Sequence, residues 1–233
     1  MIAPCGHRGR PGAMRRKDNT FPSRSASGVN VKIIGCVPKL IRSNVEKYGM
    51  NDSSILPPAP PPPPGNCICL IGMPGAGKTA LGRALAAELG MAHMDTDALI
   101  EAHYGTRLQA VTDSMGKEEF LDVEGYIIGT VLAANTVIST GGTAVSRPHA
   151  VRRLRARGPV VSLRAALPVI LERIATAQDR GIAIAPGETI EDLYHERARL
   201  YESAANLIFE PEEQSVQLNA EKLAHLLKDS AFI

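Results

Sequence analysis

The stretch Cys67-Ile-Cys-Leu-Ile-Gly72-Met-Pro-Gly75-Ala-Gly77-Lys78-Thr79 decides the fold of this chain. Its first five residues are apolar and predict a buried strand, and residues 79–89 carry leucine at every fourth position, as one face of a helix does. Between them lies the pattern Gly-x-x-x-x-Gly-Lys-Thr, which indicates a phosphate site when it follows a strand and opens a helix. Backbone N–H groups of such a loop point at a polyphosphate, and the helix N-terminus adds a positive end. The chain is therefore predicted to bind a nucleoside triphosphate.

This P-loop also assigns roles to single residues. Lys78 is expected to reach the β- and γ-phosphates, and the Thr79 hydroxyl to bind magnesium. The expected cofactors are therefore ATP and Mg²⁺. The residues of the loop that are expected to hold the nucleotide are Gly72, Gly75, Ala76, Gly77, Lys78, Thr79 and Ala80.

The charge of the chain is unevenly distributed. Residues 1–48 carry ten Lys or Arg and two acidic residues, whereas residues 49–233 carry sixteen Lys or Arg and twenty-two Asp or Glu. Nucleic-acid binding needs a basic footprint, so the acidic body predicts no nucleic-acid partner. No stretch approaches the roughly 20 apolar residues of a membrane helix, and the first thirty residues lack the apolar core of a secretory signal. We expect a cytoplasmic monomer without a membrane partner, with Cys67 and Cys69 as buried, reduced thiols.

Residues 1–65 differ in composition from the rest of the chain. They are rich in Ser, Gly, Asn and Arg, and residues 57–65 form a proline run that can join neither a sheet nor a helix. We predict a disordered basic and proline-rich extension at 1–65 and one P-loop domain at 66–233. Three other interpretations stay open: an organelle transit peptide, a start codon assigned too early with Met50 as the true initiator, and a proline run that binds a partner.

From residue 66 onward, strand patterns alternate with helix patterns. Strands are expected at 67–71, 91–94, 136–139, 159–163 and 206–209, and helices at 79–89, 98–100, 120–131, 146–158, 167–174, 189–201 and 218–228. Ser146 is expected to cap the helix that carries Pro148 in its first turn, and Thr189 with Asp192 to form a capping box. The arginines near the end of helix 146–158 are expected to form a solvated face. The alternation predicts an α/β fold: a five-stranded parallel sheet with helices on both faces and ligands at the carboxyl ends of its strands.

Two classes of P-loop protein are excluded by missing motifs. A GTPase reads guanine with an Asn-Lys-x-Asp-type motif, but no lysine occurs between Lys117 and Lys222. A motor or helicase ATPase normally ends a strand in Asp or Asp-Glu, whereas here strand 136–139 runs into Gly141-Gly142. The nearest carboxylates are Asp95 and Asp97. Acidic residues beside a P-loop, with a glycine pair and a flexible arginine-bearing loop, indicate a small-molecule kinase.

In such a kinase each of these residues has a chemical task. Asp95 would help to hold the hydrated magnesium ion. Asp97 would orient the acceptor hydroxyl and could take its proton. An arginine of the flexible loop at residues 177–188, the lid, would neutralise charge on the transferred phosphoryl group.

On these residues the chain resembles the shikimate kinase family, over essentially all of residues 66–230. The matching motifs are the P-loop, Asp95-Thr-Asp97, Glu119-Phe120 with Glu124, Ser139-x-Gly141-Gly142, Arg173 and Arg180 seven apart, and Arg197-Ala-x-Leu-Tyr201. The resemblance implies a nucleoside-monophosphate-kinase-like fold and the ATP-dependent conversion of shikimate to shikimate 3-phosphate in aromatic amino acid biosynthesis. It also implies that Arg173 stacks on adenine, that Arg180 closes from the lid, and that Arg197 grips the substrate carboxylate.

The resemblance thus implies a complete set of site residues. The implied catalytic residues are Lys78, Asp97 and Arg180, the substrate-binding residues are Asp97, Glu124, Gly141, Gly142 and Arg197, and the metal-binding residues are Thr79 and Asp95; Arg173 and Arg180 also bind the nucleotide.

Three positions depart from the family pattern. Leu121 stands where the family carries a second arginine on the substrate carboxylate, Thr143 replaces the third glycine of the substrate loop, and Arg180-Gly-Ile-Ala replaces the lid's usual Arg-Pro-Leu-Leu. An arginine–carboxylate contact is worth about 2–3 kcal/mol, so its loss predicts weaker binding of shikimate. Arg199, two positions from Arg197 on one helix, is expected to point elsewhere.

The departures leave the acceptor open between two kinds of molecule. With leucine at position 121, Glu124 lacks its expected partner, and with Asp122 beside it the pocket would welcome an ammonium group. A hydroxy amino acid such as homoserine is therefore the alternative to shikimate. A nucleotide-binding module without catalysis is the third interpretation, against which the presence of Asp97 and Arg180 argues.

Overall fold

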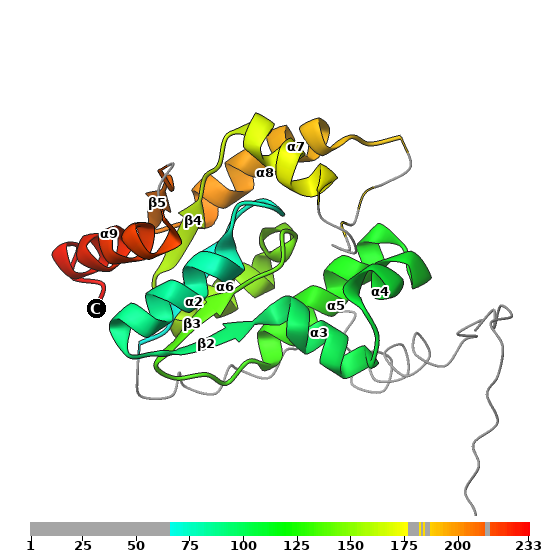
Figure 1. The fold of residues 1–233 in the computed structure, drawn as a ribbon. Helices are drawn as coiled ribbons and strands as arrows, with labels where there is room; N and C mark the ends of the chain where they lie inside the picture. Colours follow the sequence, from blue (N-terminus) through cyan, green and yellow to red (C-terminus); the bar gives the residue numbers. More distant parts are fainter. Residues whose placement is uncertain (1–65, 177–181, 183, 185–186, 213–214) are drawn as a thin grey trace, which may run out of the picture. The chain divides into compact units, whose positions relative to one another are not determined.

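The computed structural model of the chain describes residues 66–176, 182, 184, 187–212 and 215–233, and the following account concerns these residues (Figure 1). The extension predicted at 1–65 and the lid residue Arg180 lie outside them.

Within the described residues, five parallel strands form one sheet in the order β2-β3-β1-β4-β5. The strands are β1 (Ile68–Ile71), β2 (Ala92–Asp95), β3 (Thr136–Ser139), β4 (Val160–Leu163) and β5 (Leu207–Phe209). The strand before the P-loop is central, since Ile68 pairs with Val137 of β3 and Cys69 pairs with Val160 of β4. The prediction of a five-stranded parallel sheet is confirmed, and each strand lies within one residue of its expected bounds.

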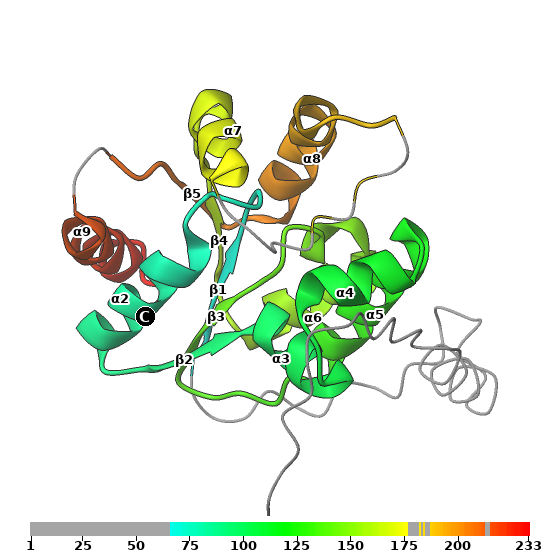
Figure 2. The ribbon, with the colours of Figure 1, turned by 45° about the vertical axis from the view of Figure 1, so that its right-hand side comes forward.

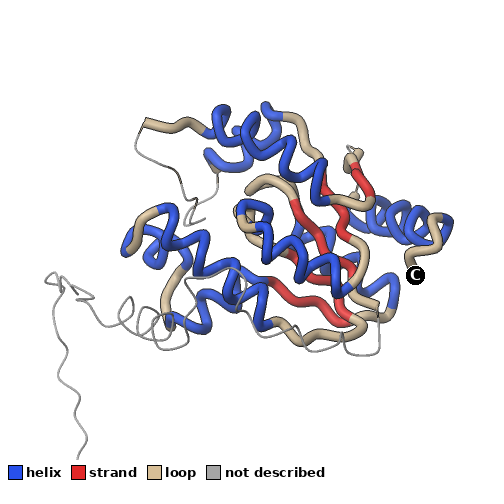
Figure 3. The backbone as a smooth tube through the Cα atoms, turned by 180° about the vertical axis from the view of Figure 1, so that it is seen from behind, coloured by secondary structure: helices blue, strands red, loops and turns tan. Residues whose placement is uncertain are grey.

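Helices cover both faces of this sheet, as predicted. They are α2 (Lys78–Leu89), α3 (Thr96–Tyr104), α4 (Leu108–Ser114), α5 (Lys117–Thr130), α6 (Pro148–Arg157), α7 (Leu167–Ala175), α8 (Ile190–Ala204) and α9 (Val216–Asp229), with a 3₁₀ turn, η1, at Ala144–Ser146. Helices α2 and α9 pack together on one face, while α6 and α8 contact the other (Figure 2). The same layering is visible from behind, where the strands run between helices (Figure 3). None of the helices described is long and apolar enough to cross a membrane.

The structure differs from the local expectations at one helix and one helix cap, and it confirms a second cap. Helix α4 was not expected, because only Leu108 and Val111 of its seven residues are buried and so short a segment shows little periodicity. Ser146 does not cap α6: it ends η1, and Arg147 takes the N-cap position without a side-chain hydrogen bond. The capping box of Thr189 and Asp192 is present at the start of α8.

The arginines at the end of α6 are not all solvated, contrary to expectation. Arg157 is buried, and Arg155 donates hydrogen bonds to the carbonyl oxygens of Ser203 (2.6 Å) and Ala204 (3.2 Å). Both acceptors lie at the end of α8, where helical carbonyls lack partners within the helix. Arg155 therefore links α6 to α8, and both Arg152 and Arg155 are exposed as expected.

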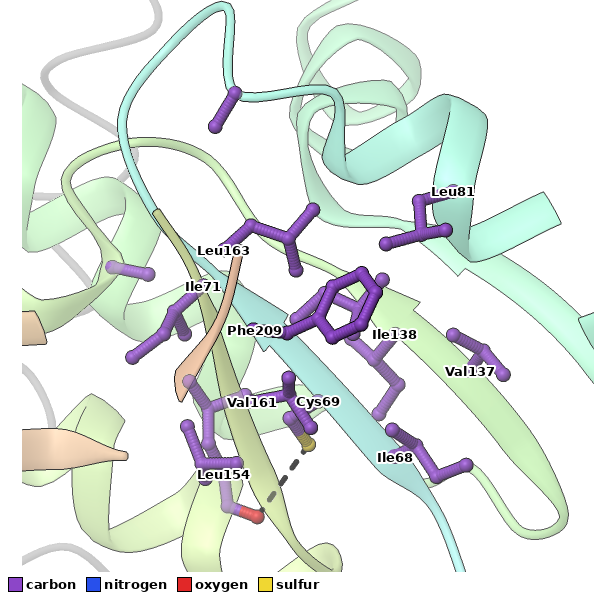
Figure 4. Packing of buried hydrophobic residues seen from close by; sticks show 14 of the residues in the cluster. Ile68, Cys69, Ile71, Leu81, Val137, Ile138, Leu154, Val161, Leu163 and Phe209 are labelled. Atoms are coloured by element: carbon purple, nitrogen blue, oxygen red, sulfur yellow. Dashed lines mark hydrogen bonds between the residues drawn. The ribbon is translucent and has the colours of Figure 1, made fainter. Parts of the chain in front are cut away.

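The core is centred on β1, whose four residues are completely buried. Figure 4 shows Leu163 and Phe209 on the side of the sheet that faces Leu81, with Ile71 on the other side, and the Cys69 thiol donates to the Leu154 carbonyl oxygen at 3.6 Å. A strand of a parallel sheet that is covered on both faces carries consecutive apolar residues, which is why residues 67–71 do not alternate between apolar and polar. A smaller apolar cluster joins α3, α4 and α5 through Ile100, Leu108, Val111, Phe120, Val123 and Ile127. It holds these three helices beside the carboxyl end of the sheet.

Candidate active site

A pocket of about 430 Å³ opens where β1, β2 and β3 end. Segments that are far apart in the sequence line it, among them the P-loop, the start of α3 with Asp97, Glu124 of α5, the 140–143 loop after β3, and Arg197 of α8. Ligand sites at the carboxyl ends of parallel strands are expected for this architecture. The described part of the chain thus brings the predicted metal and acceptor residues and most of the predicted phosphate-loop residues into one cavity.

The P-loop has the backbone that its glycines allow. Gly75 and Gly77 have φ angles of +84° and +95°, which side-chain-bearing residues rarely adopt, and Gly77 is the N-cap of α2. The N–H groups of the first helical turn have no partners inside the helix, so they remain available to an anion. Lys78 is nearly buried, and its Nζ donates to the carbonyl oxygens of Gly72 (2.8 Å) and Met73 (2.9 Å).

The seven residues predicted to hold the nucleotide divide into two groups. Gly75, Gly77, Lys78, Thr79 and Ala80 line the pocket. Ala76 is buried, and Gly72 (φ +142°) lies against β4, where a Cβ atom would come within 2.5 Å of the Leu163 carbonyl oxygen. These two residues shape the loop and do not line the cavity.

Thr79 and Asp95 meet at the metal position that the sequence predicts. The Thr79 hydroxyl donates to Asp95 Oδ2 at 2.7 Å, and Asp95 Oδ1 accepts from the Asp97 N–H at 3.0 Å as the N-cap of α3. Oxygen ligands are those that Mg²⁺ prefers, so this pair fits the ion. Among the described residues, no group of three or more His, Cys, Asp and Glu could hold a metal alone. A magnesium ion here would therefore draw its other ligands from water and nucleotide phosphates.

Arg173 is one of the two arginines predicted to contact the nucleotide. Arg173 of α7 reaches the P-loop, where its guanidinium donates to the Gly75 carbonyl oxygen at 3.0 Å. It lies at the edge of the phosphate loop, in accord with a role at the nucleotide, while Arg180 lies outside the described residues.

The glycine pair after β3 allows two carboxyl groups to approach each other. A Cβ atom at Gly141 would lie 2.1 Å from Glu124 Oε1 and 2.6 Å from Asp97 Oδ1, so only glycine leaves both oxygens in place. The Gly141 N–H donates to the Thr96 hydroxyl at 3.1 Å, and the Gly142 carbonyl oxygen accepts from the Tyr201 hydroxyl at 2.5 Å. The loop is thereby tied to both α3 and α8.

The two facing carboxyl groups differ in charge state. Burial, followed by the negative charge of Asp95, raises the pKa of Asp97 to about 6, against the opposing effect of Lys78. Burial, followed by the charge of Asp97, raises the pKa of Glu124 to about 8, although Thr143, Arg197 and Lys78 oppose the shift. At neutral pH, Asp97 is therefore mostly ionised and Glu124 mostly protonated. A carboxylate whose pKa lies near the working pH suits general base catalysis.

Arg197 places a cation on the acceptor side of the pocket. Its side chain is only 2% exposed, on the inner face of α8, while Arg199 is exposed and points away as expected. The expectation that Asp122 joins Glu124 as a second acid of the pocket is wrong. The Asp122 side chain is 69% exposed and forms an ion pair with Arg147 Nε at 2.7 Å. Residues two apart on a helix point to opposite sides, which accounts for the difference.

Two pocket features were not predicted from the sequence. The Thr143 hydroxyl donates a short hydrogen bond to Glu124 Oε2, so Glu124 has a partner although Leu121 is not an arginine. Leu121 itself is buried and is not among the described residues that line the pocket. Arg83 lines the pocket one helical turn after Thr79. The only sequence signal for the first feature was that Thr143 departs from a glycine.

Comparisons with known proteins agree with this geometry. The family model described as shikimate kinase matches residues 74–228. The shikimate kinase of Paracidovorax citrulli is 38% identical over 150 residues, which cover 62% of this chain and 82% of that protein. The shikimate kinase of Chromobacterium violaceum is 35% identical over 176 residues, which cover 74% of this chain and 95% of that protein. The structure of shikimate kinase from Acinetobacter baumannii in complex with shikimate aligns with a TM-score of 0.67 and 27% identity, covering 73% of this chain and 97% of that one.

Proposed function

This chain belongs to the shikimate kinase family, and on that premise we propose that it transfers the γ-phosphoryl group of ATP to a hydroxyl group of shikimate. The observation that carries the proposal is the arrangement of Lys78, Asp97 and Arg197 around one pocket. A phosphate-binding lysine, a carboxylate for the acceptor hydroxyl and a cation for the acceptor carboxylate are what this transfer requires.

The transfer can be written for the residues of this pocket. The P-loop N–H groups and Lys78 hold the ATP phosphates, and Arg197 holds the acceptor carboxylate so that its hydroxyl lies beside Asp97. The hydroxyl oxygen forms a bond to the γ-phosphorus, the bond between that phosphorus and the β,γ-bridging oxygen breaks, and ADP leaves. Asp97 accepts the hydroxyl proton. A magnesium ion bound by Thr79 and Asp95 would supply positive charge to the phosphates.

An acceptor that bears an ammonium group is the weaker candidate. It was suggested by two acids, Glu124 and Asp122, of which Asp122 lies outside the pocket. The pKa of Glu124, raised to about 8 chiefly by burial, makes the ionised form that would pair with an ammonium group less favourable.

The test is coupled ADP release by the full chain, with shikimate and L-homoserine assayed side by side. We expect turnover of shikimate, with ³¹P NMR showing one new phosphomonoester, and little turnover of homoserine. Turnover of homoserine alone would mean a changed substrate. ATP binding without turnover of either acceptor would instead favour a nucleotide-binding module.

A further inference from the structure

Glu124 is held from one side only. Its side chain is 1% exposed, and the Thr143 hydroxyl donates to its Oε2 atom. Its other oxygen, Oε1, accepts no hydrogen bond from any described residue. That oxygen lies beside the Cα atom of Gly141, in the pocket that Asp97 also lines. A buried polar atom without a partner is costly in a folded protein, which is why such atoms point to a bound ligand or to water.

We propose that Thr143 is a positioning residue that fixes the Glu124 carboxyl group so that Oε1 faces the acceptor beside Asp97, and that this pair determines how tightly the acceptor binds. The inference rests on the proposed kinase function and adds a specificity-determining contact to it. Thr143 acts through Glu124, because it holds the carboxyl oxygen that is turned away from Gly141.

The charges around Glu124 give this contact its chemistry. The groups that act on it are Asp97 of α3, Lys78 of α2 and Arg197 of α8, besides the Thr143 hydroxyl. With the pKa raised to about 8, chiefly by burial, the carboxyl group carries a proton at neutral pH. Because Oε2 accepts from Thr143, Oε1 is the carboxyl oxygen left to form a hydrogen bond with a ligand in the pocket. Glu124 can then donate a hydrogen bond to an acceptor oxygen.

A protonated Glu124 also reduces the negative charge of the pocket. Asp97 and an acceptor carboxylate both bring negative charge to this side of the pocket, where Arg197 is a buried cation. An ionised Glu124 would repel the acceptor carboxylate, whereas the neutral acid would not. The affinity for shikimate should therefore fall as the pH rises through the pKa of Glu124.

Three variants of the full chain test the pair. Thr143→Val removes the hydroxyl at nearly constant size, Thr143→Ser keeps it, and Glu124→Gln keeps the shape of the acid without its titration. We expect Thr143→Val to raise the KM for shikimate about five- to tenfold, the loss of one hydrogen bond. We expect Thr143→Ser to stay within about twofold of the wild type. The KM for ATP should not change in either of the two Thr143 variants.

The pH profile supplies a readout that a purely structural role would not move. Between about pH 6 and pH 10, the wild-type KM for shikimate should rise above about pH 8, the value to which the pKa of Glu124 is raised. Thr143→Val should move this rise to higher pH, because its lost hydrogen bond favours the ionised acid. Glu124→Gln should abolish the rise. A ¹³C NMR titration of labelled glutamate carboxyl groups follows the same ionisation without turnover.

Several outcomes would contradict the proposed role of Thr143 and Glu124 in acceptor binding. One is wild-type KM and pH dependence in Thr143→Val while shikimate is turned over. Equal impairment of Thr143→Ser and Thr143→Val would assign the effect to the shape of the loop. A carboxyl titration near pH 8 that survives in Glu124→Gln would also overturn it, whether or not shikimate is the acceptor. If the wild-type chain shows the carboxyl titration near pH 8 and Thr143→Val shifts it, but shikimate is not phosphorylated, the proposed role of Thr143 and Glu124 is retained. The proposed acceptor is then wrong. Should Thr143→Val not fold, Glu124→Gln decides alone through the titration and the KM profile.

Discussion

The phosphate side and the acceptor side of the pocket are assembled in different ways. The phosphate side is built mainly from one continuous segment, in which Lys78 bonds to the carbonyl oxygens of Gly72 and Met73 of its own loop. The acceptor side collects Asp97 from α3, Glu124 from α5 and Arg197 from α8. The first depends on local backbone conformation and the second on how helices pack. Substitutions on the acceptor side can therefore change the substrate while the phosphate side remains intact.

Replacing Lys78 should have the largest effect, because its nearly buried ammonium group lies inside the phosphate loop. Lys78→Ala should lower kcat by about 10³-fold or more, since a positioned cation stabilises the charge on the transferred phosphoryl group. Coupled ADP release measures the loss. Lys222→Ala is the matched control, as that exposed lysine forms only a surface ion pair with Glu212. Near-normal turnover by Lys78→Ala would contradict the mechanism.

Replacing Asp97 should impair the acceptor side of the pocket and leave the phosphate side unchanged. Asp97→Asn keeps the shape but removes the base, so kcat should fall by about 10²-fold while ATP binds as before. Isothermal titration with a non-hydrolysable ATP analogue measures the binding. Asp122→Asn is the matched control on the outer face of α5, where a surface ion pair contributes little. A parallel loss of ATP affinity in Asp97→Asn would show that the two sides are not independent.

Replacing Arg197 should affect the acceptor alone. Arg197→Lys keeps the charge but loses the planar guanidinium, so the KM for shikimate should rise about tenfold with little change in the KM for ATP. Steady-state kinetics with each substrate varied in turn separates these constants. Arg199→Lys, two positions along the same helix on its exposed side, is the control. Equal effects of Arg197→Lys and Arg199→Lys would contradict the role of Arg197 in binding the acceptor carboxylate.

A last effect is expected on the pH dependence of stability. Because the pKa of Glu124 is raised to about 8 in the folded chain, its stabilising contribution is complete below the unfolded pKa and is lost as the pH rises through about 8. The free energy of unfolding of wild type relative to Glu124→Gln should therefore fall between about pH 4.5 and pH 8. Urea unfolding at the two ends of this range measures the difference, with Glu196→Gln on the exposed side of α8 as control. A constant difference across the range would mean that Glu124 is not shifted.

Much of this architecture could be predicted from the sequence because its signals are local. A buried strand, a glycine loop and a helix follow one another in residues 67–89, while Asp95 ends one strand of the same sheet and Gly141 follows another. The carboxyl ends of parallel strands meet at one edge, so these residues had to converge.

The parts that could not be predicted depend on packing between distant segments. The hydrogen bond from Thr143 to Glu124 joins residues 19 apart, on a loop and a helix, and no periodicity reports it. The error at Asp122 has a related origin, since nearness in sequence was taken for nearness in space. Arg155 is exposed as expected, but its hydrogen bonds to the end of α8 could not be predicted, because their acceptors lie far along the chain.

The central place of β1 also affects the order in which the chain can fold. It is the first of the described strands, yet its neighbours β3 and β4 end only at Ser139 and Leu163. During synthesis the strand before the P-loop must wait for both, and such distant pairings slow folding. A nascent chain halted before β4 would leave an edge of β1 open beside its apolar faces, a template for pairing with other chains. The residues that will hold ATP are thus made early, and the segment leading into them stays vulnerable until the fourth strand has been synthesised.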